Sequence, residues 1–484
     1  MRLQTERYLG RDIIGLPNSE RCVVISNSER TMSACPRKWW FLQAERLRPR
    51  AKRRPLSFGI GWDLLMEDRA AWFMVHDTEY LGDGFHCVWC CGQGGGYEEP
   101  TEGSPGGPWT CDECGGSGWG PLRRIHERWL QERRDALSEF GGDESYTQPL
   151  EDIEDIKEAL KRAFEGYAYT YGNAPHRFYR VVGVKLQISR PILNPRTGNP
   201  YLGTMHIIEL DDGRMRLAQT GEALQPPVGS RTRAVRWPWY QIGELDALLQ
   251  DRNTGALFVT DFKSSTGPRH YLESSQVDPQ ITGYSWMLER VVREGRMVEP
   301  SANCVGGIKP ETRIGGYLYD VTSSSMQRDP KSLKEPKGGW KPGKTKLSVA
   351  KNGGAPSWRF VNAIKAIGDD PKLYAEHLRW LERFHDPKLY VTEPAMIGPV
   401  ERGAYGIEIY GVAREHSRLW RKAATCTDAI DVEMRFPRRA ICRMPGGSCA
   451  FTGPCLQDGP EARTYYRQAE PLEWQRSDDA EQGE

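Results

Sequence analysis

Residues 243–265, GELDALLQDRNTGALFVTDFKSS, constrain the fold most, because two apolar runs flank a short polar turn. This pattern predicts a β-hairpin. If its turn is centred between Asn253 and Thr254, then Asp246 on the first strand lies directly opposite Asp261 on the second. Lys263 follows Asp261 by two residues, so both side chains project from the same face of their strand.

Facing carboxylates have Cβ atoms about 4.5 to 5.5 Å apart and repel each other unless a positive charge lies between them. A hard divalent cation, Mg²⁺ or Mn²⁺, is the natural occupant for Asp246 and Asp261. With the Lys263 ammonium beside it, such an ion suits hydrolysis of a phosphodiester, since the ion activates a water and the Lys stabilises negative charge. The alternative is a surface hairpin whose Asp and Lys side chains form exposed ion pairs.

The segments GELD and DFK resemble the G-x-x-D and D-x-K motifs of the PD-(D/E)XK nuclease superfamily, in particular its RecB-like branch. DPQITGY is similar to the Q-x-x-x-Y helix motif of that branch and supplies Gln280 and Tyr284, which share a helix face and would contact phosphate or brace the Lys. In SFGIGWD, Gly59 is followed four residues later by Asp63, where relatives have a metal-binding His. A carboxylate also ligates Mg²⁺, so Asp63 is expected to replace that His.

The resemblance implies an α/β fold: a restriction-endonuclease-like core with a central mixed sheet flanked by helices, plus an inserted zinc-ribbon-like module. It implies a metal-dependent DNA nuclease, exonuclease-like, acting on DNA ends or single strands in recombination, repair or phage replication. Lys185 stands where many relatives carry a Glu and is expected to pack at the rim. Asp63 and Lys185 keep open a catalytically inactive DNA-binding or assembly protein of the same fold. RNA processing is a third possibility.

Cysteines at the two ends of the chain suggest a second metal group. Cys35 lies near the start, and Cys442, Cys449 and Cys455 lie near the end. This arrangement resembles the iron-sulfur staple of RecB-like nucleases such as the CRISPR-adaptation nucleases, which implies a [4Fe-4S] cluster on the four thiolates. The alternatives are a zinc site or buried reduced cysteines, although zinc usually prefers closer pairs.

A separate cysteine group lies in a Gly-rich stretch, where CVWCCGQG and CDECGGSG each match C-x-x-C-x-G-x-G. The four thiolates of this group predict a tetrahedral zinc site on two glycine-rich turns: they are Cys87, Cys90, Cys111 and Cys114. The half-motifs resemble the zinc-binding repeats of J-protein chaperones, from which only zinc binding is carried over. Cys22, Cys91, Cys304 and Cys426 are expected to be core or loop thiols.

Composition limits the remaining possibilities. The net charge of the 484 residues is only +1, so no global basicity indicates nucleic acid, and basic runs such as 46–54 indicate phosphate contact only weakly. No uncharged apolar run reaches the length of a membrane span, and the start lacks a signal-peptide core, so we expect a cytoplasmic protein that binds DNA and no membrane. A helicase or recombination partner stays open.

The chain divides by composition into successive parts. These are an N-terminal helical part with the first cluster cysteine (1–80), the zinc-binding module (81–121), a helical connector (122–180), the nuclease core (181–300), a Lys-rich insertion (301–362), C-terminal helices with the iron-sulfur staple (363–465) and an acidic tail (466–484). Within the first part, residues 25–47 predict a helix entered through a capping box of Ser26 and Glu29. Residues 278–295 predict another, with Asp278 as N-cap and Pro279 at its first position.

Overall fold

The computed structural model describes the larger part of the chain. The described residues are 13–16, 22–30, 35–45, 47–49, 54–82, 120–139, 149–172, 176–211, 215–218, 221–265, 267–275, 279–301, 303–324 and 390–436, with short pieces at 86, 88, 93, 95–98, 107–110, 117, 142, 333–334, 348–349, 443–444, 447–448, 451, 455 and 466–468.

A central, open, mixed β-sheet organises the fold, as the sequence predicts for an α/β protein. Its main path runs β13–β10–β9–β8–β6–β7, and β5 and β1 also pair with β8. The strands are β1 (Val23–Ser26), β5 (Tyr179–Pro191), β6 (Leu202–Leu210), β7 (Met215–Leu217), β8 (Ser230–Asp251), β9 (Leu257–Ser265), β10 (Ile314–Ser323) and β13 (Tyr390–Met396). Strands β1 and β8 pair in parallel, as do β9 and β10, and the other neighbours are antiparallel.

The predicted hairpin is confirmed as β8 and β9. Ala247 pairs with Thr260, and the register continues without a shift to the last pair before the turn. The turn forms because Asp251 Oδ1 accepts hydrogen bonds from the backbone N–H groups of Asn253 at 3.0 Å and Thr254 at 2.7 Å. Gly255 then takes a φ of +72°, which glycine adopts without strain.

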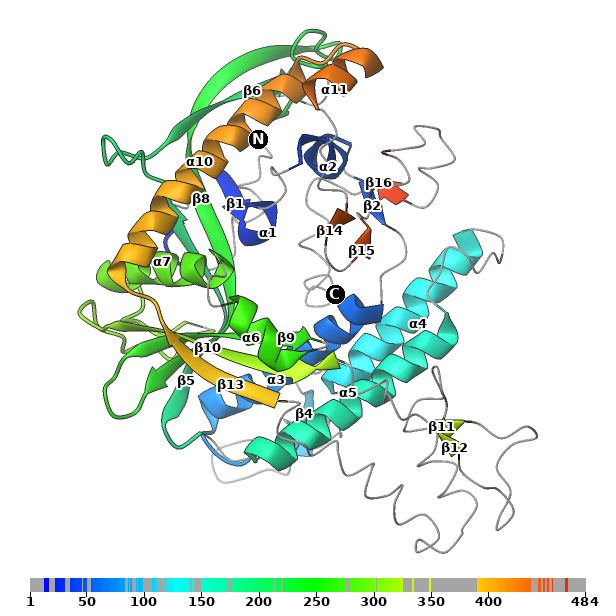
Figure 1. Cartoon of the computed structure of the whole chain (residues 1–484), viewed down its shortest axis with the longest axis vertical. Coiled ribbons are helices and arrows are strands. Elements are labelled where there is room, and N and C mark those ends of the chain that lie inside the picture. The colour runs from blue at the N-terminus through cyan, green and yellow to red at the C-terminus, as the bar shows by residue number, and fades with distance from the viewer. Residues whose placement is uncertain are drawn as a thin grey trace, which may run out of the picture.

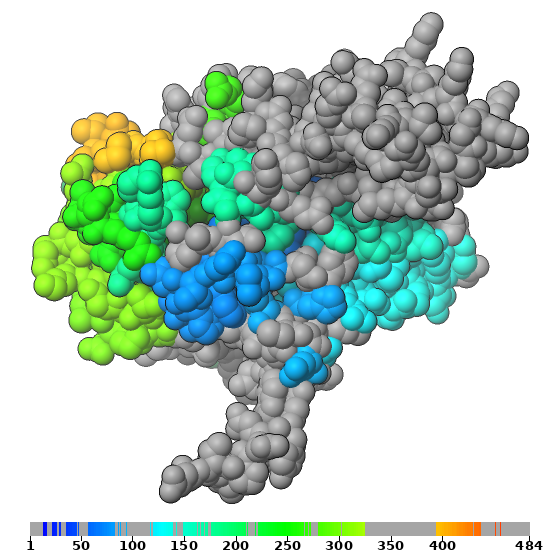
Figure 2. Space-filling view, turned by 90° about the horizontal axis from the view of Figure 1, so that it is seen from below, coloured from blue at the N-terminus to red at the C-terminus, as the bar shows by residue number. Residues whose placement is uncertain are grey.

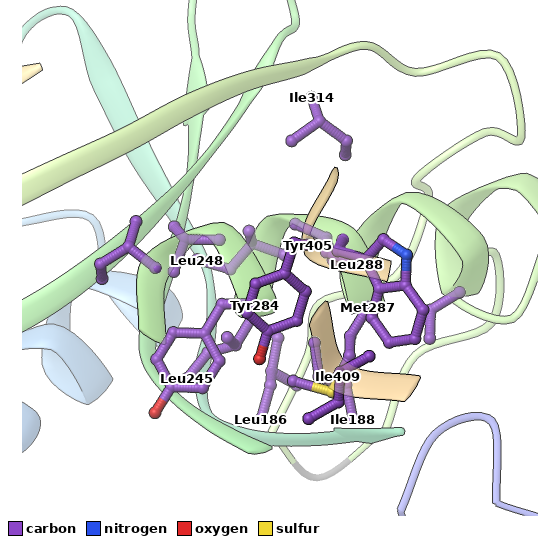
Figure 3. Close-up of a cluster of buried hydrophobic side chains, with 14 of the residues drawn as sticks. Leu186, Ile188, Leu245, Leu248, Tyr284, Met287, Leu288, Ile314, Tyr405 and Ile409 are labelled. Atoms are coloured by element: carbon purple, nitrogen blue, oxygen red, sulfur yellow. The ribbon is translucent and has the colours of Figure 1, made fainter. Parts of the chain in front are cut away.

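Helices cover both faces of this sheet (Figure 1). Side chains alternate along β9, so Val259 packs into one hydrophobic cluster and Phe262 into another. The Val259 cluster contains residues of α7 (Pro279–Arg293) and α10 (Pro399–Ala424), and Figure 3 shows their side chains meeting those of β5 and β8. The Phe262 cluster contains residues of α3 (Arg54–Val75), α4 (Pro121–Glu139) and α5 (Leu150–Tyr171).

The long strand β8 joins the two halves of the sheet. Its first half pairs with β6, and its second half pairs with β5 and β9. Figure 1 shows α10 running along β6, where Ser417 Oγ donates a hydrogen bond to the Thr204 carbonyl at 3.0 Å. In the space-filling view from below, the blue atoms of α3 lie between green and yellow-green atoms from the middle of the chain on one side and the cyan atoms of the α4 and α5 region on the other (Figure 2).

The sheet is wider than the range 181–300 assigned to the nuclease core. Strand β10 comes from residues 301–362, the range expected to be an insertion, and every one of its residues is buried. It pairs in parallel with β9, with Tyr319 beside Asp261. Strand β13 then pairs with β10 at the edge. A continuous buried run of this kind is typical of an inner strand, and the glycines around it hide that signal in the sequence.

Segments near the start and near the end of the chain come together in a separate hydrophobic cluster. It joins α2 (Pro36–Trp39) and the π-helix η2 (Trp40–Ala44) to the end of α10 and to Phe436, Phe451 and Cys455. Strand β2 (Leu47–Pro49) pairs with β16 (Tyr466–Gln468) beside them. The remaining elements are α1 (Asn27–Arg30), α6 (Pro268–Ser275), α11 (Ala429–Arg435), and the short pairs β3 (Gly95–Glu98) with β4 (Gly107–Thr110), β11 (Leu333–Lys334) with β12 (Ser348–Val349), and β14 (Arg443–Met444) with β15 (Gly447–Ser448).

Two helix predictions have different outcomes. The capping box is confirmed, because Ser26 N donates to Glu29 Oε2 at 2.8 Å and Glu29 N donates to Ser26 Oγ at 3.4 Å. The single helix over 25–47 is wrong, since Pro36 forces Cys35 into an extended conformation and α2 starts afresh. Helix α7 begins at Pro279 as predicted, while its predicted cap Asp278 lies outside the described residues.

None of the helices in the described part of the chain combines the length and the apolar character that crossing a bilayer requires.

Candidate active site

The acidic pair lies where β8 and β9 leave their regular ladder. Ala247 and Thr260 are the last paired residues, so Asp246 and Asp261 come next and lie side by side. Asp246 Oδ2 accepts a hydrogen bond at 2.8 Å from the backbone N–H of Phe262, which fixes this carboxylate against β9. Asp261 is only 2% exposed. The pair is therefore inside the molecule, and the alternative of an exposed surface hairpin is wrong.

Burial sets the charge of this pair. It raises the pKa of Asp261 to about 7 against the opposing charge of Lys263, and the neighbouring Asp246 adds to the rise. Burial alone would also raise the pKa of Asp246, but the ammonium groups of Lys185 and Lys263 lower it below its ordinary value. The pair therefore favours an ionised Asp246, and Asp261 holds a proton more readily than an ordinary aspartate does.

Lys263 lies directly beside the acidic pair, as its spacing predicts. Its Nζ donates a hydrogen bond to Asp261 Oδ1 at 2.8 Å. Burial alone would lower the pKa of Lys263, but Asp261 and Asp246 raise it above its ordinary value. The side chain thus presents a permanent positive charge next to the two carboxylates.

Helix α7 brings Gln280 and Tyr284 to the same place. Gln280 Nε2 donates a hydrogen bond to the Tyr284 hydroxyl at 2.9 Å. Burial and the charge of Asp261 raise the pKa of Tyr284 above its ordinary value, so the phenol stays neutral beside the acids. The helix packs this closely because Gly243 faces it: a Cβ on Gly243 would lie 2.6 Å from Tyr284 Cε1. Figure 3 shows Tyr284 among the apolar side chains of this interface.

Helix α3 contributes Asp63, and its partner is Lys185 of β5. Lys185 Nζ donates hydrogen bonds to Asp63 Oδ2 at 2.8 Å and to Asp246 Oδ1 at 3.2 Å. Lys185 thus joins α3 and β8 through two carboxylates, an ionic contact that was not expected for this residue. The reason is its backbone, which takes a φ of +47° and places the side chain between α3 and β8.

Two further acidic residues were not singled out in the sequence. Glu67 Oε2 lies 3.8 Å and Glu244 Oε1 lies 3.6 Å from Lys185 Nζ. Burial raises the pKa of Glu67 to about 8, and that of Asp63 to about 6, against the opposing charge of Lys185. Spacing offered a signal for both, since Glu67 follows Asp63 by one helical turn and Glu244 precedes Asp246 by two strand positions.

Two carboxylate oxygen atoms of the site have no hydrogen-bond partner among the described residues. Asp63 Oδ1 and Asp261 Oδ2 are buried, and no donor in the described part of the chain reaches them. Such oxygens are costly to bury unless a cation or a donor meets them, and Mg²⁺ and Mn²⁺ prefer carboxylate ligands. As the side chains stand, no His, Cys, Asp and Glu group among the described residues has the arrangement of a metal site. The Lys185 ammonium is the cation found between Asp63 and Asp246.

The predicted cysteine groups fall mostly outside the described residues. Cys35 and Cys455 are described, whereas the two other predicted iron-sulfur ligands, Cys442 and Cys449, and the four predicted zinc ligands, Cys87, Cys90, Cys111 and Cys114, are not. Cys35 precedes α2 as its N-cap residue, and Cys455 belongs to the hydrophobic cluster that contains α2. Of the cysteines expected to be core thiols, Cys22, Cys304 and Cys426 are buried, and Cys91 is outside the described residues.

Comparison with protein-family models, curated proteins and solved structures finds no match to this chain.

Proposed function

We propose that this protein is a metal-dependent nuclease that hydrolyses phosphodiester bonds in DNA, acting as an exonuclease on DNA ends or single strands. The mixed sheet with α3 on one face and α7 on the other is consistent with a restriction-endonuclease-like core of the PD-(D/E)XK type. Recombination, repair or phage replication is the setting in which such an enzyme would act.

One observation carries the proposal: motif residues from two strands and a helix converge on one buried point. Asp246 and Asp261 meet through the hairpin, Lys263 contacts Asp261, and α7 brings Tyr284 beside them. Burying several carboxylates together is unfavourable unless they hold a ligand or do chemistry.

Each residue of the site would have a separate role in the reaction. Lys263 would orient the attacking water and stabilise the negative charge that develops on the phosphoryl group. Gln280 and Tyr284 would act as positioning residues, because their mutual hydrogen bond fixes the face of α7 that lies against the acids. Asp261, whose pKa is raised by burial in the metal-free protein, would give up its proton when it binds the ion.

Asp246, Asp261 and Asp63 would hold Mg²⁺ or Mn²⁺, and the buried oxygens Asp63 Oδ1 and Asp261 Oδ2 fit such an ion. When bound, the ion would lower the pKa of a water and polarise the phosphoryl oxygen.

The cysteine groups remain part of the proposal. A [4Fe-4S] cluster on Cys35, Cys442, Cys449 and Cys455 is supported by the pairing of β2 with β16, which brings the two ends of the chain together. Zinc on the other four cysteines is supported by the pairing of Gly95 with Thr110, since the β3–β4 hairpin brings the flanks of the two cysteine motifs together. Anaerobic purification with metal analysis should find about four irons and about one zinc per chain, and a protein free of both metals would refute these two assignments.

The function is tested by the intact, anaerobically purified protein with Mn²⁺ or Mg²⁺ and end-labelled DNA. Wild-type protein should degrade linear DNA and stop when EDTA is added. Lys263→Ala should lower the rate by at least about a hundredfold, because it removes the charge that stabilises the transition state. The variant should keep its melting temperature within a few degrees, since protonated Asp261 tolerates the loss of its partner. Lys309→Ala, a change on an exposed loop, is the matched control and should retain full activity.

One observation favours a second candidate function, a catalytically inactive DNA-binding or assembly protein of the same fold. This observation is the Lys185 ammonium, which already neutralises part of the acidic cluster. If wild type and Lys263→Ala both leave single-stranded DNA, double-stranded DNA and RNA intact under each metal, while wild type still binds DNA, this second function replaces the first. Degradation of RNA alone would instead identify a ribonuclease.

A further inference from the structure

Lys185 lies at the centre of an acidic cluster that belongs to several elements. Its Nζ is 2.8 Å from Asp63 Oδ2 and 3.2 Å from Asp246 Oδ1, with Glu244 and Glu67 at 3.6 and 3.8 Å. The Lys185 side chain is 18% exposed, so solvent screens these contacts only partly. An ammonium surrounded by carboxylate oxygens in this way occupies the kind of position that a metal ion takes.

The backbone at Lys185 is held in an unusual conformation. Its φ of +47° lies in the left-handed region, which a lysine rarely adopts. The residues on either side of Lys185 face opposite sides of the sheet. Val184 packs in the hydrophobic cluster that contains α3, whereas Leu186 packs in the cluster that contains α7. In a regular strand these two residues would share a face. Strain of this kind persists when the surrounding contacts fix it, and here it directs the ammonium toward Asp63 and Asp246.

The ammonium uses oxygens that a divalent cation would need. Asp246 Oδ2 is already bound to the backbone N–H of Phe262, so Oδ1 is its remaining oxygen, and Lys185 holds it. Lys185 also holds Asp63 Oδ2, and only Oδ1 of that carboxylate is left. Two cations cannot share these oxygens at contact distance without strong mutual repulsion. Metal and ammonium therefore exclude each other between Asp63 and Asp246.

We propose that Lys185 is a built-in competitor for the divalent cation: its ammonium closes the site in the metal-free protein, and metal binds between Asp63 and Asp246 only when this ammonium moves away. The inference rests on the proposed function and adds a regulatory step to it. Glu67 and Glu244 provide the place to which the ammonium moves. Both lie within a short swing of its flexible stem, and their side chains are 31% and 41% exposed, nearer to solvent than Asp246.

The test compares Mn²⁺ binding by wild-type protein and Lys185→Met, which keeps the length of the side chain and removes its charge. Calorimetric titration of the intact, anaerobically purified protein gives the affinity without relying on nuclease activity. Lys185→Met should bind Mn²⁺ at least about tenfold more tightly than wild type, because the competing charge is gone. The double variant Lys185→Met with Asp246→Asn should lose this gain. Lys157→Met, which removes a lysine that pairs with Glu154 on α5, should bind as wild type does.

Thermal melting with and without Mn²⁺ measures metal binding even if Lys185→Met is too unstable for calorimetry. Lys185→Met should melt at a lower temperature than wild type without metal, and Mn²⁺ should raise its melting temperature by more than it raises that of wild type. Lys185→Asn is the second variant, since Asn tolerates the left-handed backbone. Equal or weaker Mn²⁺ binding by both variants, with wild type binding, would overturn the competitor role and leave the metal-dependent function standing. Absence of Mn²⁺ binding in every variant and in wild type would overturn both.

Discussion

At the scale of single residues, the site has more carboxyl groups than the two lysines beside them can neutralise. The pKa of Glu67 is raised to about 8, that of Asp261 to about 7 and that of Asp63 to about 6, in each case mainly by burial. Without a metal ion the site therefore keeps protons near neutral pH. An ion that binds there has to release them, so its affinity should rise with pH as well as with the removal of Lys185.

At the same scale, Gly243 decides how closely α7 approaches the acids. A Cβ at this position would lie 2.6 Å from Tyr284 Cε1 and 2.7 Å from Met287 Cε. Gly243→Ala should therefore push the helix outward, lower the stability by about 1 to 3 kcal/mol, and reduce nuclease activity through misplaced Gln280 and Tyr284. Chemical denaturation and rate measurements check both effects.

Gly403 provides the comparison for this change, because a Cβ there has nothing within 4 Å and the residue lies inside α10. Gly403→Ala should be neutral or slightly stabilising. Equal behaviour of the two alanine variants would show that the contact between α7 and β8 does not depend on Gly243.

At the scale of elements, α10 joins the sheet to the N-terminal segments of the chain. Its His416 accepts a hydrogen bond at Nδ1 from Trp39 Nε1 at 3.2 Å, so the ring proton lies on Nε2 and is donated to the Glu29 carbonyl at 3.1 Å. Burial lowers the pKa of His416 to about 4. The ring, 3% exposed, is neutral in the folded protein and connects α10 with α1 and α2.

Because His416 is buried in its neutral form, we expect the free energy of unfolding to fall in acid. The unfolded chain binds the proton near pH 6.5 and the folded chain only near pH 4, so the contribution of His416 is complete above pH 6.5 and is lost as the pH falls toward 4. The loss should be about 3 kcal/mol. In His416→Gln, the free energy of unfolding should fall less steeply over this range, whereas His76→Gln, at an exposed position, should keep the wild-type slope. Identical slopes for all three proteins would rule out the neutral, buried ring.

Elements governed by local chemistry were predictable from the sequence, and those governed by distant contacts were not. The turn of Asp251 with Asn253 and Thr254 fixes the register of β8 and β9, so the sequence alone places Asp246 beside Asp261. The start of α7 at Pro279 is equally local. The left-handed backbone of Lys185 has no local signal, and its position depends on carboxylates from α3 and β8. For the same reason β10 was missed as a sheet strand, since its pairing with β9 joins segments separated by α6 and α7.

At the scale of the whole molecule, a segment near the start of the chain packs against segments near its end. The residues of this contact are not those of the acidic site. Trp39 is fully buried and contacts the rings of Trp420 and Phe436, while Phe41 stacks on Phe451. This contact closes a loop that contains almost the whole chain, which costs conformational entropy that the aromatic cluster has to offset.

Trp39→Ala should therefore destabilise the protein by about 3 to 5 kcal/mol through the cavity that it leaves. Thermal or chemical unfolding measures the loss, and proteolysis should release the C-terminal segment first. Leu224→Ala truncates an apolar side chain that is already exposed, and it should change stability by less than about 0.5 kcal/mol. A similarly small effect of Trp39→Ala would mean that the two ends are not held together through this ring.

Strand β8 runs without interruption for 22 residues and is paired along its length with β6, β5, β1 and β9. Because successive side chains of a strand point in opposite directions, inserting or deleting one residue in it would turn Asp246 away from Asp261 unless every neighbouring strand slipped by the same step. The pairing of β8 with β9 therefore fixes the number of residues between Asp246 and the turn.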